Sequence, residues 1–250
     1  MVTQHKGKWK NWSRYKINIH DAIAQGMPLP DGVAELKTLF DSDSWAMLYE
    51  CQWAEDGSAL LGWDMLHKLA TDNEIRIWAD PVYCGVDVGR TNDRFAVANV
   101  GMVGANYRLL HMDLEKNLPF SEMRHLLDDV FRKYPVKRMN IDSTGLGMQL
   151  AEEVVKEHSG IAVGKHFSRP LKEKLALNLL KLCEDEQLIL PNDPALLAQL
   201  HSIKKKATAT GITYDADRDS TGHADGFWAL ALAVEGLSKR YSSGWGVAVW

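Results

Sequence analysis

Residues 83–93 read Tyr-Cys-Gly-Val-Asp-Val-Gly-Arg-Thr-Asn-Asp, and the apolar run Phe-Ala-Val-Ala-Asn-Val follows at residues 95–100. This stretch predicts a buried strand that delivers Asp87, a polar turn at Gly89 that ends in a second acid, Asp93, and a returning strand. A carboxylate at the end of a buried strand costs free energy unless a cation or strong hydrogen bonds compensate it. Taken alone, the motif would be a capping Asp in a hairpin turn, so its meaning depends on the rest of the chain.

The composition is that of an ordinary globular protein. The chain has 250 residues, of which 46% are hydrophobic and 25% charged, enough for one large domain with an extension or for two small domains. The net charge of −4 restricts any nucleic-acid interface to a local patch. We expect no transmembrane span, because no apolar run reaches about 18 residues, and no secretory signal, because no apolar segment follows the basic residues of the N-terminus. Three widely separated cysteines favour a reducing cytoplasm.

Three segments are expected along the chain. Residues 1–80 are expected to form an N-terminal extension, in which a basic and aromatic arm precedes helices. Residues 81–237 are expected to form the main domain, and residues 238–250 a Ser/Gly-rich flexible tail. The basic arm could grip a nucleic-acid backbone, but its period-two alternation favours a solubilising edge strand.

The order of elements expected in residues 81–237 predicts an α/β fold. Three strands follow one another through short links before an amphipathic helix at residues 120–134 and a fourth strand that ends at Asp142. This order is not the βαβ repeat of a Rossmann fold, and it predicts a mixed sheet flanked by helices. The later elements are expected to be a helix at 148–157, a strand at 161–164, a helix at 171–187, a strand at 188–191, a helix at 194–202, a hairpin at 203–213 and an apolar helix at 227–237.

Two further acids stand in settings that match that of Asp87. Asp142 ends the fourth predicted strand, and Asp225 comes at the start of the apolar helix. If the first and fourth strands are neighbours, all three carboxylates can converge at one edge of the sheet. Converging carboxylates repel one another unless divalent cations neutralise them, and oxygen ligands favour Mg²⁺ or Mn²⁺ over zinc. Two such ions about 4 Å apart clamp the attacking and leaving oxygens of a phosphodiester, so the sequence predicts metal-dependent phosphodiester cleavage.

Three motifs resemble, in order and spacing, the C-terminal nuclease domain of large terminase subunits from tailed phages, above all Mu-like phages and prophages. They are GVDVGRTND at 85–93, MNIDSTGLG at 139–147 and GHADGFWALALA at 222–233, and the resemblance covers roughly residues 80–237. It implies an RNase H-like fold and a metal-dependent endonuclease that cuts concatemeric or integrated DNA around genome packaging in the host cytoplasm. The implied partners are double-stranded DNA and, in the full packaging machine, an ATPase motor domain, a small terminase subunit and the portal.

Carried over position by position, the resemblance assigns Asp87, Asp142 and Asp225 to a metal-binding catalytic triad and Asp93 to an accessory acid. Asp87 is expected to bridge two Mg²⁺ or Mn²⁺ ions, while Asp142 and Asp225 each hold one and orient water. His223 either positions water or a phosphate, or caps the helix that follows it. The expected DNA contacts are the basic residues Arg169, Lys172, Lys174, Lys204, Lys205 and Lys206.

Of these basic residues, Arg169, Lys172 and Lys174 are preferred because they lie at a helix N-terminus, which is a natural phosphate site. The run Lys204–Lys206 could track a DNA backbone or serve as a charged edge strand that blocks aggregation.

Two other functional classes stay open. GVDVGRTN also resembles the phosphate loop of sugar kinases with an actin-like ATPase fold, which would place Asp87 on a nucleotide-bound metal ion. No second Gly-rich segment follows Asp142 to support that interpretation. A non-catalytic packaging or portal-docking module would leave the three acids without a role. No G-x-x-x-x-G-K-[ST] motif occurs in the sequence, so it contains no sign of a packaging ATPase.

Overall fold

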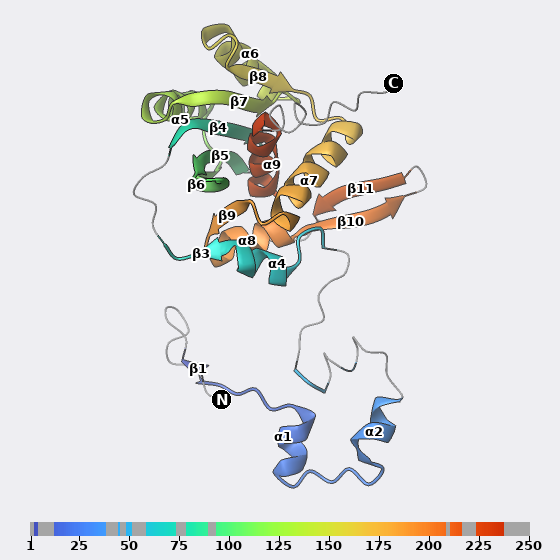
Figure 1. Cartoon of the computed structure of the whole chain (residues 1–250). Helices are drawn as coiled ribbons and strands as arrows, with labels where there is room; N and C mark the ends of the chain where they lie inside the picture. The colour runs from blue at the N-terminus through green and yellow to red at the C-terminus, as the bar shows by residue number, and fades with distance from the viewer. Residues whose placement is uncertain are drawn as a thin grey trace, which may run out of the picture. The chain divides into compact units, whose positions relative to one another are not determined.

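The computed structural model describes residues 3–4, 13–38, 45, 49–51, 59–73, 79–89, 94–208, 211–216 and 224–237. The chain divides into two compact units, Met1–Gly57 and Ser58–Trp250, which are described separately (Figure 1). None of the helices in the described ranges combines the length and apolar character that crossing a bilayer requires. The predicted C-terminal tail, residues 238–250, lies outside the described residues.

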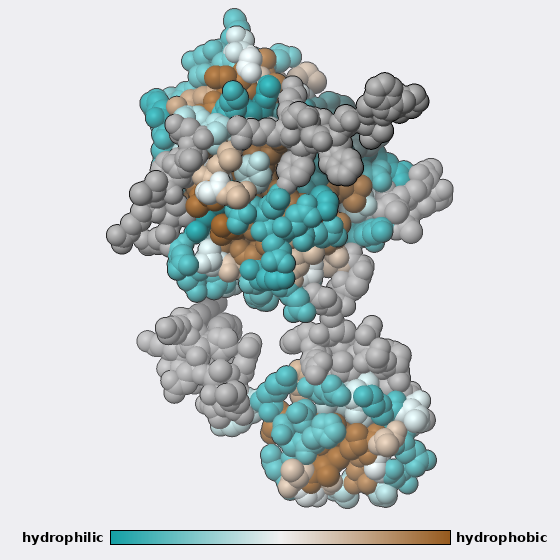
Figure 2. Space-filling model, in the orientation of Figure 1, coloured by the Kyte–Doolittle hydropathy of each residue, from teal (hydrophilic) through white to brown (hydrophobic). Residues whose placement is uncertain are grey.

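The described residues of the first unit include the short helices α1 and α2 and one pair of two-residue strands. Helix α1 (Ile19–Ala24) begins with a capping box, in which Asn18 and Asp21 exchange side-chain and main-chain hydrogen bonds. Helix α2 spans Gly32–Lys37, and strand β1 (Thr3–Gln4) pairs antiparallel with β2 (Ser13–Arg14). Figure 2 shows hydrophobic surface on this unit. Among its described residues, Tyr15, Ile17 and Met27 are large, hydrophobic and exposed. Short helices such as these cannot bury all of their apolar side chains against one another.

The second unit begins before the boundary at residue 80 that the sequence predicts. Helix α4 (Trp63–Leu69) buries Leu66 and Leu69 in the core of this unit. Strand β3 (Ala70–Thr71) follows directly and pairs in parallel with β9 (Leu188–Pro191). Because this packing joins residues 58–73 to the later part of the chain, they belong with the second unit rather than with the N-terminal extension.

The second unit is built on a seven-stranded mixed sheet, in the order β3-β9-β6-β5-β4-β7-β8. Strand β5 runs antiparallel to its neighbours β4 and β6, and the remaining pairings in the sheet are parallel. This arrangement is the mixed sheet that the sequence predicts. The central strands are β4 (Ala79–Val88), β5 (Arg94–Val103), β6 (Asn106–Lys116), β7 (Val136–Asp142) and β8 (Ala162–Lys165).

Helices cover both faces of this sheet (Figure 1). Side chains alternate between the faces along a strand, so β4 sends Val82, Val86 and Val88 into one core and Tyr83 into the other. The first core packs against α5 (Phe120–Lys133) and α6 (Gly147–Glu157). The second packs against α4, α7 (Arg169–Glu184), α8 (Pro194–His201) and α9 (Asp225–Leu237). The antiparallel hairpin of β10 (Ile203–Thr208) and β11 (Gly211–Ala216) forms a separate small sheet.

Helix α9 lies directly on the backbone of β4. A Cβ atom at Gly85 would stand 2.0 Å from the carbonyl oxygen of Ala229 and 2.4 Å from the amide nitrogen of Ala233. Both atoms belong to the main chain, so neither can move without shifting the helix. Ala229 and Ala233 are fully buried, and their small side chains permit the close approach that glycine completes on the strand.

Substitution of Gly85 by Ala should therefore destabilise the second unit by about 3 kcal/mol or more, as overpacking against main-chain atoms does. The measurement is the free energy of unfolding in urea. The matched control is Gly104→Ala, where a Cβ has open space and the positive φ of +63° alone costs about 1 kcal/mol. Equal losses in the two variants would contradict the close helix–strand contact.

Candidate active site

Asp87 and Asp142 lie side by side at the carboxyl ends of neighbouring parallel strands. Val86 of β4 is the register partner of Ile141 of β7, and the two acids come one residue later on each strand. Val86 and Ile141 face the core beneath α5 and α6, so the alternation of side chains turns both acids towards the α9 face. The exposed fractions are 8% for Asp87 and 6% for Asp142.

Asp225 reaches the same edge from helix α9. It is the first residue of the helix, and its Oδ2 accepts a 2.9 Å hydrogen bond from the main-chain amide of Arg94. Arg94 begins β5, the strand on which Ala96 is the register partner of Asp87. Asp225 is 9% exposed. The structure thus places the three sequence-predicted acids at one edge and on one face of the sheet.

The carboxylate of Asp142 is held by the turn that follows β7. Its Oδ1 accepts a 2.9 Å hydrogen bond from the amide of Thr144. Burial raises the pKa of Asp142 above its ordinary value, and this effect outweighs the hydrogen bonds from Thr144 and the nearby charges of Lys172 and His166, which lower it. In the absence of another cation, the fold therefore opposes ionisation of this carboxyl group.

Lys172 is held next to this turn by two aromatic rings. Its Nζ lies 4.8 Å from the ring centre of Trp228 and 5.6 Å from that of Phe167. Trp228 stands one helical turn after Asp225, and the amide of Phe167 donates a 3.1 Å hydrogen bond to Oγ1 of Thr144. The predicted DNA contact Lys172 therefore belongs to the same edge as the acids.

Lys174 is arranged differently. Its Nζ lies 3.6 Å from Oε1 of Glu235, which also pairs with Lys165 at 3.1 Å. The other carboxylate oxygen of Glu235 accepts a 2.9 Å hydrogen bond from Asn140. This network ties α7 and α9 to the strands β7 and β8.

The remaining predicted residues are more scattered. Arg169 begins α7, which is capped by Ser168. The run Lys204–Lys206 lies on the separate hairpin, where Lys204 is the register partner of Asp215 and Lys205 is exposed. Nζ of Lys206 donates a 3.4 Å hydrogen bond to the carbonyl of Ala216. Asp93 and His223 lie outside the described residues.

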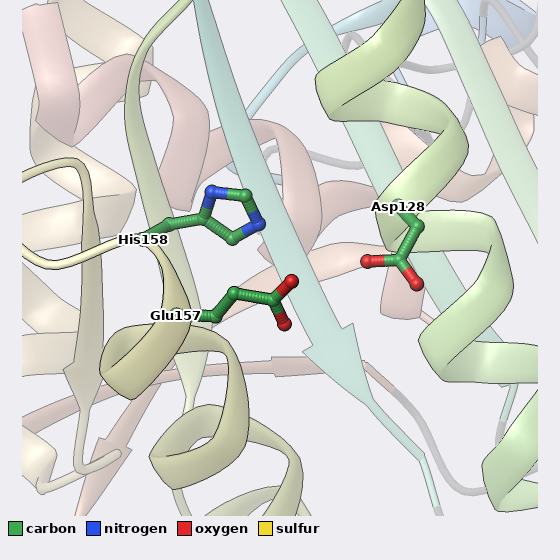
Figure 3. Close-up of side chains that lie close together, drawn as sticks. All are labelled: Asp128, Glu157 and His158. Atoms are coloured by element: carbon green, nitrogen blue, oxygen red, sulfur yellow. The ribbon is translucent and has the colours of Figure 1, made fainter.

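A second group of potential metal ligands lies elsewhere, between α5 and the end of α6. Within the described ranges, one set of three such residues has all its ligand atoms within 4.8 Å of one another, namely Asp128, Glu157 and His158 (Figure 3). The carboxylate oxygens of Asp87, Asp142 and Asp225 do not all lie within 4.8 Å of one another. Arg124 pairs with both Asp128 and Glu157, and the ring of His158 stacks on Phe131 at 3.6 Å. Since Arg124 already supplies the positive charge, we interpret this group as an ion-pair network that joins two helices.

The sequence analysis did not select Arg94, Lys165, Asn140 or Glu235. Asn140 lies within the motif that carries Asp142, and Arg94 directly follows the motif that carries Asp87. Their closeness to these motifs is the sequence feature that could have identified them. No local sequence pattern points to Lys165 or Glu235, because their ion pair depends on the packing of β8 against β7 and of α9 on the sheet.

Residues 84–236 of the chain match the model of the terminase RNaseH-like domain family. The chain is 24% identical over 247 residues to the probable terminase, ATPase subunit, of Haemophilus phage HP1, covering 91% of this chain and 40% of that protein. It is also 24% identical over 260 residues to the terminase, ATPase subunit, of Escherichia phage P2, covering 95% of this chain and 42% of that protein. The chain therefore spans about two fifths of the length of these curated relatives.

Solved structures show the same fold. The large terminase nuclease of the thermophilic phage G20c with bound magnesium superposes with a TM-score of 0.60 at 22% identity, covering 72% of this chain and 97% of that one. The large terminase of bacteriophage HK97 superposes with a TM-score of 0.57 at 14% identity, covering 82% of this chain and 49% of that one. The predicted RNase H-like fold is thereby confirmed.

The raised pKa of Asp142 predicts how stability depends on pH. Between the ordinary value of 3.8 and the raised value, the native state binds more protons than the unfolded state. The free energy of unfolding should therefore fall as the pH rises through this window. With divalent ions removed by EDTA, Asp142→Asn should abolish this loss and raise the melting temperature at pH 7 by a few degrees.

Asp129→Asn is the matched control, because Asp129 is exposed and pairs with Arg132 on the surface of α5. Thermal unfolding across pH 3–8 is the measurement. An Asp142→Asn protein that keeps the wild-type pH dependence, or melts at a lower temperature than wild type at pH 7, would show that this carboxylate is not destabilised by burial.

Proposed function

We propose that this chain, which belongs to the terminase RNaseH-like domain family, is the metal-dependent DNA endonuclease domain of a phage packaging terminase. The observation that carries the proposal is the placement of Asp87 and Asp142 at the ends of adjacent parallel strands, beneath the N-terminus of the helix that begins with Asp225. Acids from three separate parts of the chain meet at one edge, where simple packing would favour apolar residues.

The donor set fits a divalent cation. Each of the three carboxylates is less than a tenth exposed, and such a cluster of buried acids is unstable without compensating charge. Carboxylate oxygens suit Mg²⁺ or Mn²⁺. Structures of the G20c nuclease have been solved with bound magnesium, cobalt and zinc. Two ions held by Asp87, Asp142 and Asp225 would supply charge neutralisation and an activated water for phosphodiester hydrolysis.

The chain's own residues orient these acids. Asp87 lies on β4, between β7, which carries Asp142, and β5, whose first residue bonds Asp225, so it would hold metal together with either of them. The amide of Thr144 fixes the carboxylate of Asp142, and the amide of Arg94 fixes that of Asp225. Main-chain donors on rigid elements hold both side chains in place, as preorganised sites require. Asp93 would serve as an accessory acid, and His223 as an auxiliary group.

DNA would lie across this edge and contact basic side chains near it. The preferred contacts are Arg169 and Lys172 at the beginning of α7, where the helix N-terminus favours phosphate. Lys174 would be a weaker contact, because it already pairs with Glu235. The hairpin residues Lys204, Lys205 and Lys206 would track the backbone further along the duplex.

The packaging context is also part of the proposal. Because the chain spans about two fifths of relatives that are named terminase ATPase subunits, we assign it the nuclease role beside an ATPase motor. Its partners in the host cytoplasm would then be double-stranded DNA, the motor domain, a small terminase subunit and the portal.

Cleavage of supercoiled plasmid tests the nuclease. The wild-type chain should nick or linearise the plasmid with Mg²⁺ or Mn²⁺ and not with EDTA. Asp87→Asn, Asp142→Asn and Asp225→Asn should each reduce the cleavage rate by about 100-fold or more, as the loss of groups that stabilise the transition state does, while the fold is retained.

Asp129→Asn serves as the control, because it removes an exposed carboxylate on α5 and should cut at the wild-type rate. Cutting retained in the triad variants would assign the activity to another site or to a contaminant. Absence of cutting by the wild type, together with binding of ATP in a titration, would instead favour the kinase-like alternative.

A further inference from the structure

We infer that Arg94 and Lys172 form a pair of phosphate-binding cations at the acidic edge, and that they receive the DNA backbone at the reacting position. The inference rests on the DNA-binding part of the proposed function. It adds Arg94, which no sequence motif singled out, and it gives Lys172 a defined place beside the acids.

Arg94 is positioned by the strand that carries it. It is the first residue of β5, and its neighbours Ala96 and Ala98 face the α9 core while Phe95 and Val97 face the opposite core. Alternation along the strand therefore turns Arg94 to the face on which Asp225 lies. The hydrogen bond to Asp225 comes from the main chain of Arg94, which leaves the guanidinium available for another partner.

The guanidinium of Arg94 has an unsatisfied buried donor. Its Nε is buried and has no hydrogen-bond partner in the described part of the chain. A buried donor without a partner costs free energy, and more when it belongs to a charged group. A phosphate oxygen would satisfy it, because the fork of guanidinium donors matches the geometry of phosphate.

Lys172 lies at the same edge, close enough to Asp142 for its charge to lower the pKa of that carboxyl group. Its ammonium rests over the ring of Trp228, one helical turn after Asp225, and near the ring of Phe167. Cation–π contacts hold an ammonium in place without neutralising its charge. Among the described residues, the ion pairs of this region join Lys165 and Lys174 to Glu235, and none engages Lys172. Within the described residues, no ion pair therefore holds Lys172 away from an incoming anion.

The two cations would offset the repulsion between the acidic edge and DNA. Three carboxylates at one edge repel a polyanion, and the chain as a whole carries a net charge of −4. Cations fixed beside the acids would attract the backbone to that edge and place a phosphate beside the carboxylates.

The test is the salt dependence of binding to a short double-stranded DNA, measured by fluorescence anisotropy in EDTA so that no cleavage occurs. Arg94→Gln and Lys172→Gln should each reduce the slope of log Kd against log salt concentration by about 0.9, and each should weaken binding about tenfold at 0.1 M salt. Arg94→Lys, which keeps the charge, should retain most of the wild-type slope.

Two controls remove the same charge elsewhere. Arg108→Gln changes β6 at the opposite end of the sheet, where Arg108 is the register partner of Gly101. Lys181→Gln changes the far end of α7, where Lys181 pairs with Asp185. Both should keep the wild-type slope. A slope unchanged in Arg94→Gln or in Lys172→Gln, or a wild type that does not bind DNA, would overturn the inference.

The plasmid assay separates this inference from the proposed nuclease. A wild type that cuts plasmid while both test variants keep its salt slope refutes the cation pair alone. A wild type that shows the expected slopes but never cuts with Mg²⁺ or Mn²⁺ refutes the nuclease and leaves the phosphate-binding pair standing.

Discussion

The contact between helix α9 and strand β4 is the constraint on which the site depends. It brings main-chain atoms of Ala229 and Ala233 against Gly85 at distances that leave no room for a side chain. This contact fixes the height and direction of the helix over the sheet, and thereby the place of Asp225 at its first residue. The buried, Ala-rich sequence of α9 therefore has a second consequence beyond core packing. It sets the spacing between an acid on a helix and the acids on the strands below.

Two of the acids at this edge are oriented by main-chain amides. Thr144 and Arg94 donate main-chain amides to Asp142 and Asp225, and these donors are fixed by the turn after β7 and by the beginning of β5. Two side-chain cations, Lys165 and Lys174, gather instead on Glu235, which stabilises the junction of β8, α7 and α9. The main-chain amides orient the carboxylates of Asp142 and Asp225 for the proposed metal ions.

Much of the fold could be predicted from local sequence patterns, and the failures have a common physical cause. Strands β4 to β7 and helices α5 and α9 followed from periodicity, and the acids stood out because each ends or begins a buried element. Strand β3 could not be predicted from periodicity, because its two residues form a strand only by pairing with β9, far along the chain. The position of Lys172 over Trp228 and the role of Arg94 likewise depend on which elements become neighbours. Local patterns identify elements, whereas tertiary packing decides which side chains meet.

The same packing explains why two lysines only two residues apart behave differently. Lys172 and Lys174 both lie in the first turns of α7, yet the helix turns them towards different partners, aromatic rings for one and Glu235 for the other. An ion pair largely cancels the field of a lysine, whereas an aromatic face holds the ammonium and leaves its charge intact. Sequence reasoning that treats the cluster as one basic patch misses this distinction. The acidic edge thus has a structural cation that joins its supporting elements and a separate cation that remains charged beside the carboxylates, where an incoming phosphate needs it.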